Sequence, residues 1–276
     1  MLSTISKRIL SSCFILFLVA SCADTRTMNQ SAANQYRQAI AAEKQKGNVD
    51  TSSTTAKRVH RVFNRMVPYA RQYNKTGVPF AWEVSVIKSN EVNAWAMPGG
   101  KMVVYTGLVN KLGLSDEEIA VVMGHEMAHA LLEHGKSQAN RQTAVGVVAA
   151  IVSVSLASQG MDSGLSQDVV GTVADLGVIK PFSRSAESEA DEIGLMLSAQ
   201  AGYNPQVAPG LWDKMQRLGG GGNVPTIFST HPSDQSRKAH LEKLMPKAME
   251  LYQASKNNLI LRKFLCKNKS LQFRVY

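Results

Sequence analysis

One short stretch, His125-Glu126-Met127-Ala128-His129, restricts what this 276-residue chain can be more than any other part of it. It lies in a segment that opens with the capping-box pattern Ser115-Asp116-Glu117-Glu118 and stays largely apolar up to Gly135, which predicts one helix from Asp116 to His134. Residues four apart on a helix lie on the same face, so both imidazoles can point at one ion. Two neutral imidazole nitrogens on a rigid helix supply half of a zinc site.

The glutamate of this motif is the candidate general base. Glu126 lies about 100° around the helix from His125, close to the ion but turned away from ligation, where it can accept a proton from the attacking water. A catalytic zinc also needs a third protein ligand, and the candidates are His134, His231, His240 and later carboxylates. His134 is nine residues from His125, so we expect it on the opposite helix face and not as a ligand.

A second acidic motif, residues 182–191, opens another predicted helix that runs to Gly202. Glu187 and Asp191 are again four residues apart, so Glu187 can reach the metal while Asp191 accepts the outer N–H of a ligand histidine. For Glu189 and Glu192, exposed positions in an acidic first turn are the better interpretation. Close packing of this helix on the first is favoured by small residues, namely Gly124, Ala186, Ala190 and Gly194.

A Pro-Gly-Gly turn at residues 98–100 predicts a hairpin between two short strands. The second strand is Lys101–Tyr105, and residues 82–87 alternate as a further strand, which predicts a small antiparallel sheet. Its open edge is the first strand of the hairpin, Asn93, Ala94, Trp95, Ala96 and Met97. An extended peptide can add to such an edge through backbone hydrogen bonds, with little sequence preference.

Four further segments have simpler patterns. Apolar positions at helical spacing predict a packed helix over residues 54–73. The run 144–157 is too short to span a membrane and is expected to be a buried helix, with interfacial membrane contact as the alternative. Residues 158–180 are glycine-rich and predict a loop or lid. The last residues, 256–276, mix basic and bulky side chains and predict a frayed tail, with membrane-surface attraction as the alternative.

The N-terminus has the pattern of a processed signal. A basic start, an apolar run and Val19-Ala20-Ser21-Cys22 resemble a bacterial lipobox, which implies cleavage before Cys22 and lipid attachment to it. The expected organisation is a signal peptide (1–21), a lipidated polar spacer (22–53), a catalytic domain (54–255) and the tail. Ala23 after the cysteine implies export to the outer membrane, and an uncleaved anchor helix is the alternative.

The formal charge of +10 suggests nucleic-acid binding until it is divided along the chain. Lys7 and Arg8 lie in the signal, and six further basic residues lie in the tail, which leaves +2 for residues 22–255. We therefore expect no nucleic-acid partner.

Five motifs occur in this one chain: His125–His129, Asn93-Ala94 with Pro98-Gly99-Gly100, residues 183–191, Ala201-Gly202-Tyr203-Asn204-Pro205, and Thr230-His231-Pro232 with Arg237. Together they resemble the motifs of the CAAX-prenyl-protease and HtpX type of zinc metallopeptidase, and in particular those of its periplasmic lipoprotein branch. The resemblance covers about residues 55–250. It implies one Zn²⁺ per chain, ligands His125, His129 and Glu187, catalytic Glu126, and Asp191 as an outer partner. The chain lacks the spanning helices of the membrane-embedded members.

The expected fold is α+β and predominantly helical, a zincin-like metallopeptidase with its small antiparallel sheet beside the active-site helices. The resemblance implies a zinc metalloendopeptidase that cleaves misfolded or unassembled periplasmic and outer-membrane proteins at the periplasmic face of the outer membrane, with the outer-membrane assembly machinery as a candidate partner. A chaperone or scaffold that uses the same edge and only structural zinc is the competing hypothesis, and an intact Glu126 argues against it. A non-peptidase metal hydrolase has little support, because no phosphate-binding loop is evident.

His231 has three candidate roles, since it follows Gly219–Gly222 in an expected mobile loop. It can cap a helix that starts near Ser233, donate a hydrogen bond to the oxyanion, or occupy the open zinc position when no substrate is bound. The resemblance to regulated periplasmic relatives favours the last role, with a catalytic contribution once the loop moves.

Overall fold

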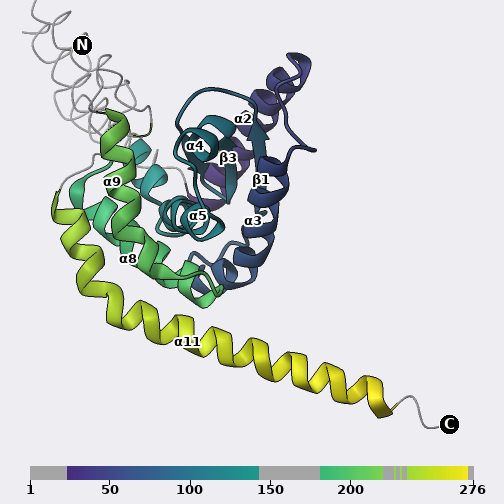
Figure 1. Cartoon of the computed structure of the whole chain (residues 1–276). Helices are drawn as coiled ribbons and strands as arrows, with labels where there is room; N and C mark the ends of the chain where they lie inside the picture. Colours follow the sequence, from purple (N-terminus) through teal and green to yellow (C-terminus); the bar gives the residue numbers. More distant parts are fainter. Residues whose placement is uncertain (1–23, 143–180, 220–226, 228–230, 232–234, 273–276) are drawn as a thin grey trace, which may run out of the picture.

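The computed structural model describes residues 24–142, 181–219, 227, 231 and 235–272 (Figure 1). The predictions for Cys22 and the signal peptide, for the helix over 144–157 and for the loop over 158–180 lie outside these residues. In chain order the elements are α2 (Thr25–Gln45), α3 (Thr54–Tyr73), β1 (Glu83–Ile87), β2 (Ala94–Met97), β3 (Lys101–Tyr105), α4 (Thr106–Lys111), α5 (Asp116–Leu131), α8 (Arg184–Gln200), η1 (Pro205–Val207), α9 (Ala208–Gly219) and α11 (Gln235–Gln272). The predominantly helical α+β fold is confirmed.

The sheet has the strand order β1-β3-β2 and is mixed. β2 and β3 form the predicted antiparallel hairpin, in which Gly99 and Gly100 adopt positive φ angles of 80° and 84° that favour glycine. β1 pairs in parallel with β3, so the prediction of an antiparallel sheet is wrong for this strand. The connection explains this pairing. From β1 the chain crosses to β2 at the far edge of the sheet and then returns through β3, which therefore runs in the same direction as β1. β2 is the edge strand, as predicted.

Both faces of the sheet are covered by helices (Figure 1). On one face, Tyr36 of α2 packs with Ile87 and Val103, and its hydroxyl donates a hydrogen bond to Ser85 Oγ at 2.7 Å. On the other face, α3 and α5 bury the larger core. The polar composition of residues 23–53 predicts a solvated spacer with at most a loose helix, whereas α2 packs on the sheet through a few apolar side chains. This part of the predicted spacer is an ordered helix of the domain.

Helices α5 and α8 cross at two glycines. A Cβ on Gly124 would lie 2.5 Å from the Gly194 carbonyl oxygen, and a Cβ on Gly194 would lie 2.5 Å from the backbone nitrogen of His125. No side chain larger than hydrogen fits at either position without separating the helices. This contact confirms the close helix packing that the small residues predicted.

The motif helix is shorter than predicted. α5 begins with the predicted capping box at Ser115 but ends at Leu131, not at His134. Glu133 has a φ of 54°, a left-handed conformation that reverses the chain, and residues 134–142 are helical again. The position of His134 is therefore set by this turn and not by the periodicity of α5.

The C-terminal segment also differs from its prediction. α11 packs Leu241 and Ala248 near Leu195 and Met196 of α8, and then extends away from the body (Figure 1). The predicted frayed tail over 256–276 is helical as far as Gln272. A lack of periodicity favours local disorder there, but a helix can continue from a well-packed preceding segment.

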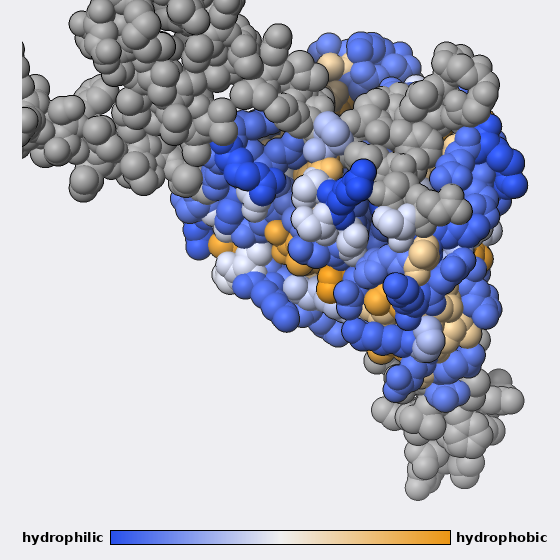
Figure 2. Space-filling model, turned by 90° about the vertical axis from the view of Figure 1, so that its left-hand side faces the viewer, coloured by the Kyte–Doolittle hydropathy of each residue, from blue (hydrophilic) through white to orange (hydrophobic). Residues whose placement is uncertain are grey.

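In the described part of the chain, no helix is both long and apolar enough to cross a membrane. Most of the described surface visible in Figure 2 is hydrophilic, and its hydrophobic residues form small groups. Among the residues whose side-chain burial is described (24–142, 181–218, 227, 231 and 236–257), Leu132 is the only large hydrophobic side chain that is exposed.

The glycine crossing yields the first prediction. Gly124→Ala should lower the free energy of unfolding by about 1–3 kcal/mol, because its methyl group overpacks the helix contact. The same variant should bind zinc more weakly, because α8 would move away from α5. Gly210→Ala is the matched control, since its Cβ would meet no atom within 4 Å. Urea unfolding and zinc titration of both variants check this, and equal stability of Gly124→Ala and wild type would contradict it.

Candidate metal centre

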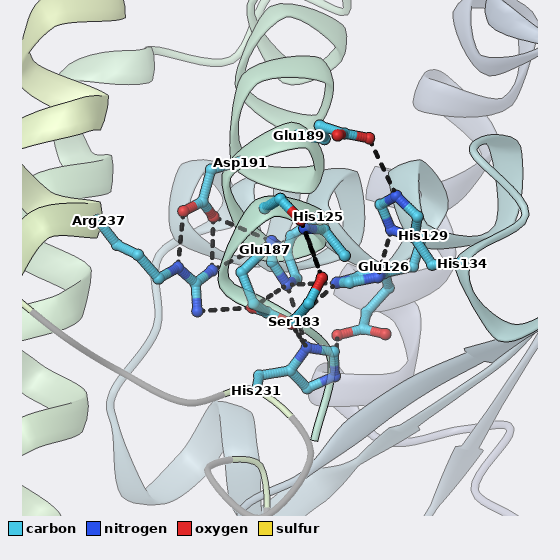
Figure 3. Close-up of polar contacts among 12 residues, drawn as sticks. His125, Glu126, His129, His134, Ser183, Glu187, Glu189, Asp191, His231 and Arg237 are labelled. Carbon is cyan, nitrogen blue, oxygen red and sulfur yellow. Dashed lines mark hydrogen bonds and ion pairs between the residues drawn. The ribbon is translucent and has the colours of Figure 1, made fainter. Parts of the chain in front are cut away.

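Four side chains from three parts of the chain converge on one point (Figure 3). His125 and His129 lie one turn apart on α5, Glu187 lies in the first turn of α8, and His231 lies between α9 and α11. Their ligand atoms are all within 4.8 Å of one another. The predicted trio of His125, His129 and Glu187 is thus brought together, and His231 joins it.

The spacing of these atoms suits a tetrahedral ion. Zinc–nitrogen bonds of about 2.0–2.1 Å place neighbouring ligand atoms about 3.3 Å apart. The His125 and His129 Nε2 atoms are 3.0 Å apart, and each lies 3.4 Å from an oxygen of Glu187. His231 Nδ1 lies 3.2 Å from His125 Nε2 and 3.0 Å from Glu187 Oε1. Three imidazoles and one carboxylate form a donor set that zinc commonly takes.

Asp191 and Arg237 support His125 from outside. Asp191 Oδ1 lies 3.0 Å from His125 Nδ1, as predicted for the partner that holds its tautomer. Arg237 donates to both oxygens of Asp191 at 2.6 and 2.7 Å, lies 2.7 Å from Glu187 Oε2, and stacks 4.0 Å from the Trp212 ring centre. The charged groups of Glu187, Asp191 and Arg237 are all buried, so the charge of each must be compensated by the others.

The pKa values of these groups follow from burial and pairing. Burial raises the pKa of Glu187, but hydrogen bonds with His125, His129 and His231 outweigh it and hold that pKa well below its usual value. Burial lowers the pKa of His125, but hydrogen bonds to Asp191 and Glu187 outweigh it and raise the pKa to about 9. Without a metal, His125 would therefore be protonated near neutral pH, and metal binding must displace that proton.

His129 is surrounded differently. The Phe182 ring stacks on it with centroids 4.2 Å apart, and its Nδ1 lies 2.9 Å from His134 Nδ1. His134 is therefore next to the metal cluster, and its prediction on the opposite helix face is wrong because Glu133 turns the chain back. His134 Nε2 in turn lies 3.3 Å from Glu189 Oε2, so Glu189 is not only a solvated residue.

Glu126 is only 2% exposed, and its carboxylate lies near both His231 of the ligand cluster and the backbone of Ala96 in β2. Its Oε1 atom has no hydrogen-bond partner among the described residues and lies 3.4 Å from His231 Nε2. Burial raises the pKa of Glu126, while neighbouring histidines and a backbone hydrogen bond from Ala96 act in the opposite direction. A carboxylate with a raised pKa, beside but outside the ligand set, has the position of a general base.

An apolar pocket lies directly beside Glu126 and His125. Its volume is about 30 Å³, and Ile227 forms part of its wall and is 5% exposed. The Ile227 N–H donates to the Val92 carbonyl at 3.3 Å, so this residue also contacts the chain that leads into β2. The remaining apolar lining comes from α5, α8, α9 and α11, namely Val121, Val122, Leu195, Leu211, Trp212, Met215 and Leu241.

Two residues of this site, Arg237 and His134, do not follow from the sequence patterns, and those patterns allow several roles for His231. Arg237 belonged to the motifs of the resemblance, but no role was assigned to it. Two acidic residues that share one helix face in the core need a buried cation, and that signal could have identified it. His134 was misplaced. His231 lies in the ligand cluster, and His240 is not one of the described residues that form it.

The ligand geometry yields the second prediction. Glu187→Ala should lose bound zinc and peptidase activity together, because it removes a ligand and leaves Arg237 without one of its partners. Glu192→Ala is the matched control, because Glu192 lies on the same helix but pairs with Lys247. Metal analysis of the purified chains checks both. Full zinc occupancy in Glu187→Ala would show that the ligand is misassigned.

Comparison with known proteins agrees with this geometry. The chain is 37% identical over 174 residues to mitochondrial metalloendopeptidase OMA1 of Arabidopsis thaliana, which is 62% of this chain and 34% of that protein. It is 29% identical over 228 residues to metalloprotease YcaL of Escherichia coli, 79% of this chain and 87% of YcaL. It is 33% identical over 172 residues to metalloprotease LoiP of the same organism, 62% of this chain and 65% of LoiP.

The chain spans 34% to 48% of the length of the plant, zebrafish and fission-yeast OMA1 proteins that it matches. Residues 53–245 match the family model described as Peptidase family M48, and they include all four converging residues. Because this match covers more than half of the sequence, the chain belongs to peptidase family M48.

Proposed function

We propose that this protein is a zinc-dependent metalloendopeptidase that cleaves misfolded or unassembled proteins of the bacterial cell envelope. The observation on which the proposal rests is the buried carboxylate of Glu126, which lies beside four convergent metal ligands without being one of them. Family membership and the similarity to proteins named metalloproteases support peptide hydrolysis. A scaffold with structural zinc would not need a buried base at this position.

In this reaction, bound zinc supplies the Lewis acid, held by His125, His129 and Glu187. Glu126 accepts the proton of the attacking water and delivers it to the leaving amine, so no acyl-enzyme forms. Its raised pKa makes it a stronger base than an exposed glutamate and allows it to hold the proton between the two steps. Asp191 and Arg237 keep His125 in the orientation that this chemistry requires.

The edge strand β2 is the proposed substrate-binding edge. Tyr105 N–H donates to the Asn93 carbonyl, and alternate residues of a strand face alternate sides, so Ala94 and Ala96 direct their backbone groups away from β3. An extended substrate pairs there through its main chain and extends across Glu126. The apolar pocket beside Glu126 then receives a small hydrophobic group next to the cleaved bond. Unfolded chains supply both features, which supports misfolded proteins as the substrate class.

His231 is the proposed inhibitory ligand of the resting site. Its Nδ1 atom lies beside His125 Nε2 and Glu187 Oε1, so it would take the fourth position around a bound ion, which a substrate carbonyl and water would otherwise need. Its Nε2 atom lies 3.4 Å from Glu126, so the same ring also shields the base. Departure of His231 would open the site, and the ring could then act as a donor to the oxyanion.

The cellular setting is part of the proposal. The lipobox at Cys22 and the residue that follows it support a lipid anchor at the periplasmic face of the outer membrane. The outer-membrane assembly machinery is the proposed partner at that location, because its unassembled clients would be accessible there. The +2 charge of residues 22–255 supports protein and not nucleic-acid partners.

A test of the proposed activity uses Glu126→Gln. This variant should retain zinc but lose at least about 10³-fold of the cleavage rate on an unfolded protein, because the base is gone while the ligands remain. Zinc analysis together with initial rates checks it. Undiminished cleavage at full zinc occupancy would contradict the peptidase mechanism. A proteomic comparison of envelope proteins in cells that carry wild type or Glu126→Gln identifies the substrates.

A separate prediction concerns the anchor. Cys22→Ser should abolish lipid labelling and release the protein from the membrane fraction, because the thiol is the attachment point for the lipid. Metabolic labelling with a fatty acid and membrane fractionation in high salt check this. Continued membrane retention of an unlabelled chain would point to another attachment site.

A further inference from the structure

The outer nitrogen of a ligand histidine needs its own partner. When His129 binds the ion through Nε2, its Nδ1 carries the proton and must donate it. The nearest described acceptor is His134 Nδ1, at 2.9 Å and in a buried contact. We infer that His134 is a positioning residue for His129, which accepts this hydrogen bond and thereby fixes the tautomer and the ring angle of the zinc ligand.

The proton arrangement of the pair follows from the donors and acceptors available. Because His134 Nδ1 accepts from His129, a neutral His134 carries its proton on Nε2. That N–H faces Glu189 Oε2 at 3.3 Å, and the carboxylate can only accept. In the hydrogen-bonded series Glu189–His134–His129, each contact thus joins one donor to one acceptor. It leads from an exposed carboxylate to the metal ligand (Figure 3).

The turn after α5 places His134 where this contact is made. Glu133 holds the left-handed conformation that reverses the chain, and it is fixed from two sides. Thr25 at the start of α2 donates to Glu133 Oε1 at 2.7 Å, and Lys136 lies 2.8 Å from Glu133 Oε2. A backbone conformation this uncommon for a non-glycine residue is kept only when the surroundings hold it.

The two ligand histidines therefore have partners of different strength. His125 faces the carboxylate of Asp191, which is anchored by the buried Arg237. His129 faces a neutral imidazole whose own partner, Glu189, is 61% exposed. A carboxylate partner raises the basicity of a ligand as well as orienting it, whereas a neutral acceptor acts mainly through orientation. His134 thus acts through His129 and not on the substrate.

The test compares His134→Gln with His134→Met in the full chain. The two side chains have similar size, but only glutamine offers an oxygen that can accept from His129 and an amide that can donate to Glu189. Zinc affinity is measured by competition with a chelator. We expect a loss of about 10- to 100-fold for His134→Met, as for other outer partners of metal ligands, and a loss below about threefold for His134→Gln.

Steady-state kinetics on an unfolded protein at saturating zinc provide a second readout. kcat should fall in His134→Met and recover in His134→Gln, while KM stays the same because His134 does not contact the substrate. His60→Met is the control for losing a histidine outside the site. Thermal unfolding of all variants confirms that they are folded.

The inference rests on the zinc site of the proposed function, and the experiment separates the two. If the wild-type chain binds no zinc, the proposed function fails. A different result is that wild type binds zinc and the glutamine and methionine variants bind it with equal affinity, either as tightly as wild type or both more weakly. The hydrogen bond then has no positioning role, and only the inference about His134 is overturned.

Discussion

The contact of α5 with α8 at Gly124 and Gly194 is the constraint on which the rest of the structure depends. It brings two helix backbones close enough for Glu187 to reach His125, which directly follows Gly124, and His129, one turn further along α5. Each helix carries two functional side chains four residues apart, so one crossing aligns both pairs. His125 and His129 meet Glu187, and Asp191 meets His125 from outside.

The crossing also buries charges that only a cation can balance. Glu187 and Asp191 lie in the interior with a single guanidinium, that of Arg237, between them. Isolated buried carboxylates are costly, and here the pKa of each is held low, in part by histidine rings. A divalent ion that replaces the proton on His125 completes this balance. The same demand explains why α11 packs against α8, since Arg237 enters from that helix.

The predictable part of the site is the part that lies within single helices. His125, His129, Glu187 and Asp191 follow from helical periodicity, and the helix over 54–73 and the hairpin follow from local patterns. His134 could not be placed, because one left-handed residue, Glu133, overrides the periodicity of α5. The parallel pairing of β1 and the docking of α2 depend on contacts distant in sequence, which neither alternation nor composition encodes. Cys22, the segment over 144–157 and the loop over 158–180 stay predictions.

The central claim is that His125, His129, Glu187 and His231 surround one zinc ion in the resting protein. X-ray absorption spectroscopy at the zinc edge of the full chain tests it most directly, because it counts imidazole ligands without requiring activity. The account predicts four nitrogen and oxygen ligands at about 2.0–2.1 Å, with three imidazoles in wild type and two in His231→Ala. A sulfur ligand, or the same imidazole count in both proteins, would contradict it.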